Sequence, residues 1–372
     1  MPYKADEPSV SWISDSADLK AAVRDFDSVV GIDSEFKRTN TFYPIPALYQ
    51  VASGKDVFLL DPLSITDWST LVDFLEDEKN LKVFHACQED LELVASHMGA
   101  TPRNVFDTQF AYAFLSDSYS LSYANLAEEM LQVGIKKNET RSDWLQRPLT
   151  AAQIEYAVED VVHLFALYER LEVKLEELNR IDWFHEDSNE RALYREVEPS
   201  EYYRTMKRAW QVEGLSLAVL KALSEWREVT ARSDNVPRRR IVWDEHLIEF
   251  AKKESLTLQD VRSLLPPAVF DQYGEEILNS YNKGKGSDVP EAVDRPLSSA
   301  QNRLVKEMRE VAQGIAKELG LSVELLGRKR DLEECVRFFE RAGRLSSFYE
   351  GWRLELIASD FLKILDLSLI HI

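Results

Sequence analysis

Two carboxylates, Asp33 and Glu35, directly follow the short apolar run at residues 29–32. The run is rich in β-branched residues and is entered from polar ones, which predicts a buried strand. Because side chains alternate along a strand, both carboxylates point to the same face, roughly 7 Å apart along the chain. Two bare carboxylates there repel each other, and one pKa rises unless a cation lies between them. A strand that leaves the core with polar residues at its end explains the pair equally well. Other residues are therefore needed to choose between a functional pair and a solvent-exposed strand end.

Three further residues occupy informative positions. Asp90 falls in the first turn of a helix predicted over residues 88–98, where a lone Asp is usually a partner of the helix dipole. Tyr156 and Asp160 are four residues apart on a helix predicted from residue 150 to about residue 178, so they share one face about 6 Å apart. A Tyr and an Asp that face a core together need polar partners.

These acids suit a site for divalent cations. Carboxylates from a strand, a strand–helix junction and a later helix can converge on hard ions, because Mg²⁺ prefers oxygen ligands and keeps several waters. Two such ions about 4 Å apart can hold the attacking and leaving oxygens of a phosphodiester. The sequence offers no Ser/His/Asp triad, glycine-rich phosphate loop or Cys/His zinc spacing as a competitor.

Length and composition set broad limits. The 372 residues are enough for two or three domains, and a hydrophobic content of 45% supports substantial cores. We find no opening apolar run of the signal-peptide type and no apolar stretch long enough to span a bilayer. Cys87 and Cys335 lie far apart, which favours a reducing compartment over a disulfide framework. The expectation is a soluble, cytoplasmic protein without a membrane partner.

The net charge of −20 is unevenly distributed. Residues 1–200 contain 37 Asp and Glu against 18 Lys and Arg, whereas the remaining residues are nearly balanced. An acidic first half suits a cation-dependent site or simple solubility, and it is not the composition of a nucleic-acid surface. Any contact with nucleic acid therefore needs local basic patches or bound metal ions.

The order of elements predicts one α/β domain followed by helices. A helix at 14–26 precedes three strands, which a short turn at 53–55 arranges as an antiparallel meander. Strand–helix units then follow, up to about residue 195. The later segments read as helical, separated by a linker at 281–296 with a hinge at 284–286. The predicted strands lie at 29–36, 49–52, 56–60, 81–85 and 105–107, and the predicted domains at 1–195, 204–284 and 295–367.

The acids and their surroundings resemble a known family. Asp33-x-Glu35, Asp90 and Tyr156-x-x-x-Asp160 look like the three motifs of the DEDD 3′–5′ exonucleases, in the variant that carries Tyr. The sequence blocks around these motifs resemble the ribonuclease D family in particular, and the resemblance extends over nearly the whole chain. These blocks are EFKRTNTFYP at 35–44, HACQEDL at 85–91, DWLQRPL at 143–149 and, in the first helical segment, VPRRRI at 236–241.

The resemblance implies a fold. It is an α/β catalytic domain with a ribonuclease H-like mixed sheet, in which antiparallel strands one to three precede parallel ones and helices flank the sheet. Two all-α helical-bundle domains follow. The first resembles the helicase-and-RNase-D C-terminal (HRDC) domain, and the second is similar to a diverged copy of it. The tail at 367–372 matches nothing expected.

The resemblance also implies roles for the five motif residues around two divalent metal ions, Mg²⁺ or Mn²⁺. Asp33 would bridge both ions, Glu35 and Asp160 would complete the site of the ion that activates water, and Asp90 would hold the second ion through water. Tyr156 would orient the attacking water, since a phenol with a pKa of about 10 is a poor base at neutral pH. Ser34 replaces the commoner Thr and, pointing away from the metals, is expected to have no effect.

The implied reaction is hydrolysis of the terminal phosphodiester of RNA, with release of nucleoside 5′-monophosphates. The implied partner is RNA with a free 3′ end, such as a tRNA precursor or another small structured RNA. No obligate protein partner is evident in the sequence. A 3′–5′ DNA exonuclease is the alternative within the family, because the sequence does not show what reads the 2′-hydroxyl. A non-catalytic RNA-binding scaffold is the alternative outside it, although no metal carboxylate is missing.

Two kinds of residue are candidates for contacting RNA. The first kind lies beside the motifs, where a Phe in the core and a structural His are the alternative explanations. The second kind lies in basic loops, which could contact the RNA backbone or could simply be a solvated loop or helix entry. The candidates are Phe36 and His85 beside the motifs, Lys136, Lys137 and Arg141 in one loop, and Arg238, Arg239 and Arg240 in the other.

Overall fold

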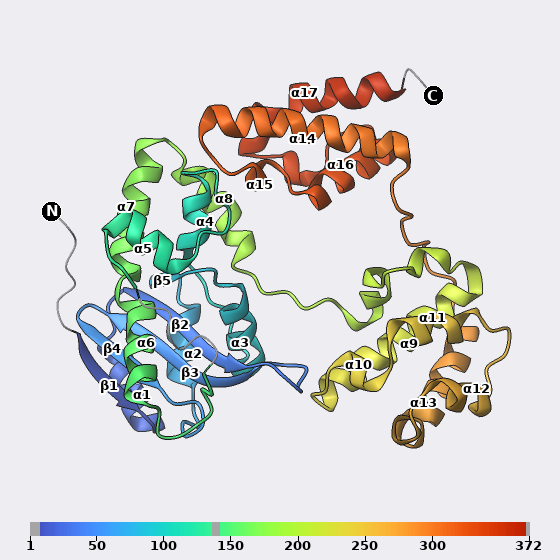
Figure 1. The fold of residues 1–372 in the computed structure, drawn as a ribbon, viewed down its shortest axis with the longest axis horizontal. Helices are drawn as coiled ribbons and strands as arrows, with labels where there is room; N and C mark the ends of the chain where they lie inside the picture. The colour runs from blue at the N-terminus through green and yellow to red at the C-terminus, as the bar shows by residue number, and fades with distance from the viewer. Residues whose placement is uncertain (1–7, 136–141, 370–372) are drawn as a thin grey trace. The chain divides into compact units, whose positions relative to one another are not determined.

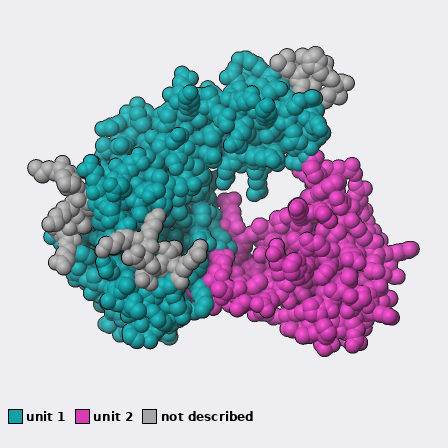
Figure 2. Space-filling view, in the orientation of Figure 1, with its two compact units in different colours: residues 1–37, 46–194, 297–372 teal, residues 38–45, 195–296 magenta. Residues whose placement is uncertain are grey.

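The computed structural model describes residues 8–135 and 142–369, with side chains through residue 366 (Figure 1). The chain divides into two compact units, which Figure 2 colours separately. Unit 1 contains residues 1–37, 46–194 and 297–372, and unit 2 contains residues 38–45 and 195–296. Neither unit is therefore one continuous stretch of chain.

A six-stranded sheet forms the centre of unit 1, in the order β1-β4-β3-β2-β5-β6. β3 and β4 pair antiparallel, whereas β2, β5 and β6 pair in parallel, so the predicted mixed sheet is confirmed. The strands are β1 (Ser9–Ile13), β2 (Val29–Lys37), β3 (Ile45–Ser53), β4 (Asp56–Leu60), β5 (Leu81–Phe84) and β6 (Val105–Asp107).

The edge strand β1 has no counterpart among the predicted strands. It pairs with β4 in parallel. Its large apolar side chains Val10 and Trp12 are 44% and 39% exposed. In a half-buried strand the alternating apolar side chains face the core, whereas here they face solvent. The Arg147 guanidinium lies 5.3 Å from the Trp12 ring centroid and covers part of it.

Helices pack against both faces of the sheet. On β2, Val30 and Ile32 belong to the core beneath α1, α2 and α3, whereas Gly31 faces Leu164 of α7. By alternation, Asp33 and Glu35 share the face of Gly31. These helices are α1 (Ser16–Arg24), α2 (Ser69–Glu76), α3 (Gln88–Met98), α4 (Thr108–Ala113), α5 (Tyr123–Leu131), α6 (Ala151–Val162), α7 (Leu164–Glu177) and α8 (Ile181–Arg191).

The last helices also belong to unit 1. Trp352 stacks on Trp183 of α8 with ring centroids 4.8 Å apart, and the Ser322 N–H donates to the Ala113 carbonyl at 2.8 Å. The region is helical as expected, whereas the boundaries at 195, 204–284 and 295–367 stay predictions. The elements are α14 (Ser299–Leu319), α15 (Val323–Leu326), α16 (Lys329–Ala342), a 3₁₀ turn (Ser347–Tyr349) and α17 (Trp352–Leu369).

Unit 2 is helical with its own core. A Cβ on Gly284 would lie 2.5 Å from the Cα of Val219, so the glycine permits close packing of α13 on α9. The hinge predicted at 284–286 is wrong, because α13 continues to Lys285. The elements are 3₁₀ turns Pro199–Thr205 and Ala209–Gln211, α9 (Gly214–Ser233), α10 (Arg238–Ile241), α11 (Asp244–Lys252), α12 (Leu258–Leu264) and α13 (Pro267–Lys285).

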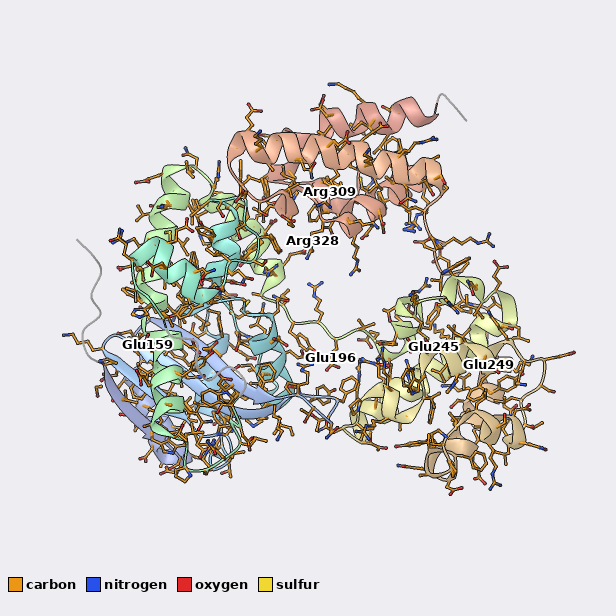
Figure 3. All side chains as sticks on the ribbon, in the orientation of Figure 1. Glu159, Glu196, Glu245, Glu249, Arg309 and Arg328 are labelled. Atoms are coloured by element: carbon orange, nitrogen blue, oxygen red, sulfur yellow. The ribbon has the colours of Figure 1, made fainter. Side chains whose placement is uncertain are left out.

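The segment at residues 38–45 joins β2 to β3 in the chain but packs in unit 2. Phe42 lies against the unit 2 core, and the Tyr43 N–H donates to Oδ1 of Asn235 at 3.0 Å. Burial raises the pKa of Tyr43, and the charge of Glu196, labelled in Figure 3, raises it further. Across the described residues of both units, no helix combines the length and apolar character needed to cross a membrane.

Candidate active site

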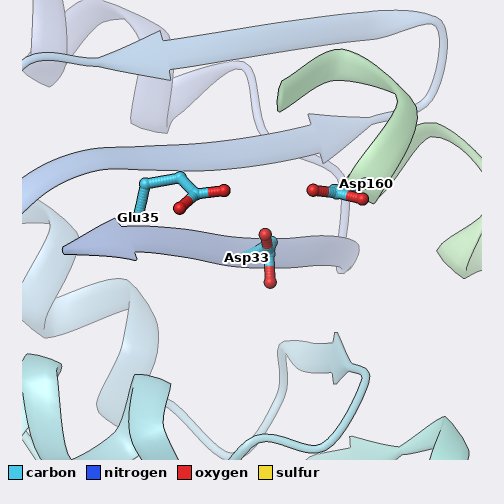
Figure 4. A group of neighbouring side chains, drawn as sticks. All are labelled: Asp33, Glu35 and Asp160. Carbon is cyan, nitrogen blue, oxygen red and sulfur yellow. The ribbon is translucent and has the colours of Figure 1, made fainter. Parts of the chain in front are cut away.

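Three carboxylates converge in unit 1 (Figure 4). One oxygen each of Asp33, Glu35 and Asp160 lies within 4.8 Å of the other two. Asp33 and Glu35 project from β2, and Asp160 projects from α6. All three side chains are partly buried. The structure thus brings together three of the five motif residues that the sequence singled out.

Close approach of the α6–α7 region to β2 brings Asp160 to this place. Gly31 precedes Asp33 by two residues on the same face of the strand. A Cβ at position 31 would lie 2.9 Å from the Leu164 Cβ and 3.1 Å from the Val161 carbonyl oxygen. Glycine therefore makes room for the backbone that immediately follows Asp160.

The single helix predicted over residues 150–178 is wrong at one point, because the structure breaks it at His163 into α6 and α7. The Tyr123 hydroxyl donates to the carbonyl of Glu159 (labelled in Figure 3) at 3.0 Å and accepts from the His163 N–H. These two backbone groups bond directly in a continuous helix. A side chain inserted between them breaks the ladder. Tyr123 carries no local sequence signal, since it lies 36 residues before Glu159.

Asp90 lies in the first turn of α3, as predicted, and is 7% exposed. It is not among the three clustered oxygens, yet its charge contributes to raising the pKa of Asp33. The Ser34 hydroxyl donates to the Asp90 carboxylate. A threonine hydroxyl could donate in the same way, so the expectation that Ser in place of Thr has no effect stays a prediction. Ser34 does point away from Asp33, but it points toward the acid on the other side of the strand.

The turn from β5 into α3 is held by a second buried acid, Asp107. Its Oδ1 accepts the Ala86 N–H at 2.9 Å, and Ala86 has a left-handed backbone with φ of +61°. Asp107 is 2% exposed and also caps α4. It thereby fixes the start of the helix that carries Asp90. Sequence reasoning missed this role, although an Asp between a strand and a helix is a common cap signal.

Burial and mutual repulsion dominate the electrostatics of the cluster. Burial, followed by the charges of Asp160 and Asp90, raises the pKa of Glu35 to about 9. Burial together with three neighbouring carboxylates raises the pKa of Asp33 well above its usual value. Burial raises the pKa of Asp90 to about 7, although the Ser34 hydrogen bond acts in the opposite direction. The cluster therefore resists holding its full negative charge without a cation.

The donor set fits a hard divalent cation. Asp33, Glu35 and Asp160 offer carboxylate oxygens within 4.8 Å of one another, and no nitrogen or sulfur ligand belongs to this group of described residues. All-oxygen sites suit Mg²⁺ and Mn²⁺ rather than zinc or copper. A bound cation would also relieve the repulsion that raises these pKa values.

Tyr156 lies on α6 one turn before Asp160, so both residues face the same side of the helix. Its ring packs against Trp144, with centroids 5.8 Å apart and planes inclined by 49°. Trp144 is buried. The aromatic contact fixes the ring on the helix face that carries Asp160.

His85 and Phe36 are part of the fold around the site. The His85 Nε2 donates to the Leu121 carbonyl at 3.1 Å, and Nδ1 lies 2.9 Å from the Thr108 hydroxyl. Phe36 is partly buried and packs against the core beneath α1, α2 and α3. The predicted contacts of both residues with a terminal nucleotide stay predictions.

Two of the three predicted RNA-binding arginines have partners inside unit 2. Arg238 donates through Nε to both oxygens of the buried Glu228, at 2.6 and 2.8 Å. Its guanidinium carbon lies 4.6 Å from the Phe42 ring centroid. Arg240 donates to Oδ1 of Asn40 at 3.0 Å. Both side chains thus hold the segment at residues 38–45.

Arg239 is exposed and lies over the ring of Trp243, 5.3 Å from its centroid. Trp243 is 50% exposed. The other predicted basic loop, with Lys136, Lys137 and Arg141, lies outside the described residues.

Comparison with known proteins identifies both parts of the chain. A family model described as 3′–5′ exonuclease matches residues 10–176, which contain all five motif residues. A model described as the HRDC domain matches residues 216–281, within unit 2. The first match covers the sheet and helices that carry the acidic cluster.

Full-length relatives extend the match across the chain. Ribonuclease D of Pseudomonas paraeruginosa is 37% identical and covers 96% of this chain and 98% of its own. Ribonuclease D of Escherichia coli is 32% identical over 92% of this chain and 94% of its own.

A solved structure agrees with both sequence matches. The crystal structure of Escherichia coli RNase D, described as an exoribonuclease involved in structured RNA processing, superimposes with a TM-score of 0.86. It is 29% identical and covers 96% of this chain and 99% of that one. With its exonuclease fold, its HRDC domain and its acidic cluster, the chain belongs to the ribonuclease D family of exoribonucleases.

Proposed function

We propose that this protein hydrolyses the terminal phosphodiester at the 3′ end of RNA and releases nucleoside 5′-monophosphates, with two divalent ions as cofactors. The observation that carries the proposal is the convergence of Asp33, Glu35 and Asp160, with Asp90 close enough to influence the pKa of Asp33. Matches to ribonuclease D over nearly the full length support the same chemistry.

The four acids divide between the two ions. Asp33 would be shared by both ions, Glu35 and Asp160 would serve the ion beside the attacking water, and Asp90 would serve the other. When bound, such a pair supplies a water of lowered pKa and a clamp for the attacking and leaving oxygens. Ser34 keeps Asp90 in place through its hydrogen bond.

Tyr156 would orient the attacking water. It lies one turn from Asp160 on the same helix face, and its ring is fixed by Trp144. A neutral phenol can both donate and accept a hydrogen bond, which suits positioning rather than proton removal. Preparing the water is then left to the ions.

The substrate we propose is RNA with an unpaired 3′ end, such as a tRNA precursor. The Escherichia coli structure is described as that of an enzyme of structured RNA processing, which supports this choice. Phe36 and His85 remain proposed contacts of the terminal nucleotide. Arg239 beside the exposed Trp243 is a proposed contact of the RNA backbone. The buried, unbridged Cys87 and Cys335 are compatible with a cytoplasmic location.

A product assay tests the proposal. A 3′-labelled RNA tail is incubated with the wild type in Mg²⁺, in Mn²⁺ and in EDTA, and a matched DNA tail is run beside it. We expect stepwise release of 5′-monophosphates from RNA in either metal and none in EDTA. Asp33→Asn should lower the rate more than about a hundredfold, since residues that merely orient metal ligands already cost about 10–100-fold.

The matched control is Asp73→Asn, which changes an exposed acid on α2 and should keep wild-type activity. Full activity in Asp33→Asn would remove the acidic cluster from the mechanism. Equal or faster digestion of the DNA tail would favour the DNA exonuclease. Binding of RNA without release of nucleotides, by folded wild type in either metal, would favour the non-catalytic scaffold.

A further inference from the structure

Tyr123 makes two backbone hydrogen bonds to a helix that is distant in sequence. It opens α5, and its hydroxyl reaches the junction of α6 and α7. The O–H donates to the Glu159 carbonyl, and the oxygen accepts from the His163 N–H. A tyrosine hydroxyl can serve as donor and acceptor at once, whereas a phenylalanine ring in the same place can do neither.

Asp160 lies beside the helix break. Asp160 is the residue directly after Glu159, so it belongs to the turn that the Tyr123 hydroxyl opens. The next residue, Val161, directs its carbonyl oxygen toward Gly31 of β2. A helix closed by the direct bond from position 163 to position 159 would place this turn differently over the strand.

The phenol is also electrostatically close to the acidic cluster. Burial, followed by the charge of Asp160 and, more weakly, of Asp33, raises the pKa of Tyr123. The ring lies edge-on to His85, with centroids 5.6 Å apart, so its place is fixed by packing as well.

We propose that Tyr123 is a positioning residue of the hydrolytic site: its hydroxyl bridges Glu159 and His163, breaks the helix beside Asp160 and so sets the Asp160 carboxylate against Asp33 and Glu35. The mechanistic part of this inference rests on the proposed function. The positioning part concerns the geometry of the acids and is testable without catalysis.

Tyr123→Phe isolates the hydroxyl. The ring packing stays, and the two backbone groups can then bond to each other, so the variant should fold. Tyr168→Phe is the matched control, because it removes a hydroxyl from α7 that bonds only to the Glu172 side chain at 2.6 Å among the contacts described. Both full-length variants and the wild type are titrated with Mn²⁺ while the melting temperature is followed. Their kcat and KM are measured on one short RNA tail.

We expect Tyr123→Phe to need about tenfold more Mn²⁺ for half of the melting-temperature shift and to lose about tenfold in kcat, the size typical of residues that orient metal ligands. Its KM for RNA should stay within about twofold of the wild type, because the ring and the RNA contacts remain. Tyr168→Phe should match the wild type in the Mn²⁺ midpoint and in kcat.

The inference is overturned if Tyr123→Phe has the Mn²⁺ midpoint and kcat of Tyr168→Phe, even when its melting temperature in EDTA is lower. That pattern would show a purely structural hydroxyl. Failure of the proposed function looks different. In that case the wild type releases no nucleotide, yet the Mn²⁺ midpoints still report whether Tyr123 sets the position of Asp160.

Discussion

At the scale of single residues, the acidic cluster stores electrostatic repulsion that a cation relieves. In the folded chain without metal, the pKa of Glu35 is raised from 4.5 to about 9. Between pH 4.5 and about pH 9, the Glu35 carboxyl is ionised in the unfolded chain but still protonated in the folded chain. Stability therefore falls as the pH rises from 4.5 toward 9, and the loss is complete above the folded-state pKa.

Glu35→Gln removes this penalty. In EDTA, its melting temperature should exceed that of the wild type by a margin that is smallest near pH 4.5 and grows up to about pH 9. The measurement is a melting-temperature series in EDTA over this range. The control is Glu155→Gln, an exposed acid on α6 that should show no such trend. A margin that stays constant or shrinks with pH would contradict the raised pKa of Glu35, which burial and the neighbouring carboxylates cause.

The faces on which Asp33, Glu35, Asp160 and Tyr156 lie could be predicted from the sequence, because the local periodicity of a strand or helix determines them. Alternation along a strand and the four-residue repeat of a helix are short-range rules. The hydrogen bonds of Ser34 and Tyr123 join residues 56 and 36 positions apart, and no local rule reports them. The family resemblance supplied the metal roles, which spacing alone does not contain.

At the scale of elements, the packing of α6 and α7 on β2 controls the site. Gly31→Val should push these helices away from the strand, because even a Cβ would lie 2.9 Å from the Leu164 Cβ. Overpacking of this kind costs about 1–3 kcal/mol of stability. A displacement of Asp160 by about 1 Å would lower kcat by up to about 10²-fold.

The measurement compares loss of kcat with loss of melting temperature. Gly314→Val on α14 is the control, since a Cβ there meets no atom within 4 Å. It should keep both quantities near wild type. A Gly31→Val variant with wild-type kcat would show that the contact with α7 does not position Asp160.

Among the elements, the prediction failed where neighbours override local pattern. The strand β1 exposes its apolar residues at a sheet edge, so its alternation gives no usable signal. The helix break at His163 is imposed by a side chain from α5. By contrast, helix α3 begins and ends as predicted, at Gln88 and Met98, where a glycine with left-handed backbone follows it.

At the scale of the whole molecule, the last helices complete the core of unit 1. Trp352 is 7% exposed, stacks on Trp183 and lies 5.8 Å from the Phe114 ring. Trp352→Ala should lower the free energy of unfolding of unit 1 by about 3–5 kcal/mol, as large aromatic truncations in cores do.

Calorimetry of the full chain measures this effect, and Trp243→Ala is the control. Trp243 is 50% exposed in unit 2, so its truncation should change stability little. Equal effects of the two substitutions would mean that α17 does not stabilise unit 1. The sequence did not reveal this shared core, because a polar, proline-containing linker before residue 297 reads as an independent boundary.

The placement of residues 38–45 in unit 2 has a consequence for the order of synthesis. Tyr43 leaves the ribosome 192 residues before Asn235, the residue of unit 2 to which its N–H donates. Unit 1 in turn lacks Trp352 until the last part of the chain emerges. Neither unit can finish folding while it is being synthesised. Apolar surface of the early strands therefore stays exposed until the later helices have been made. A nascent chain stalled before residue 195 should therefore present more apolar surface to chaperones than the same residues do in the finished protein.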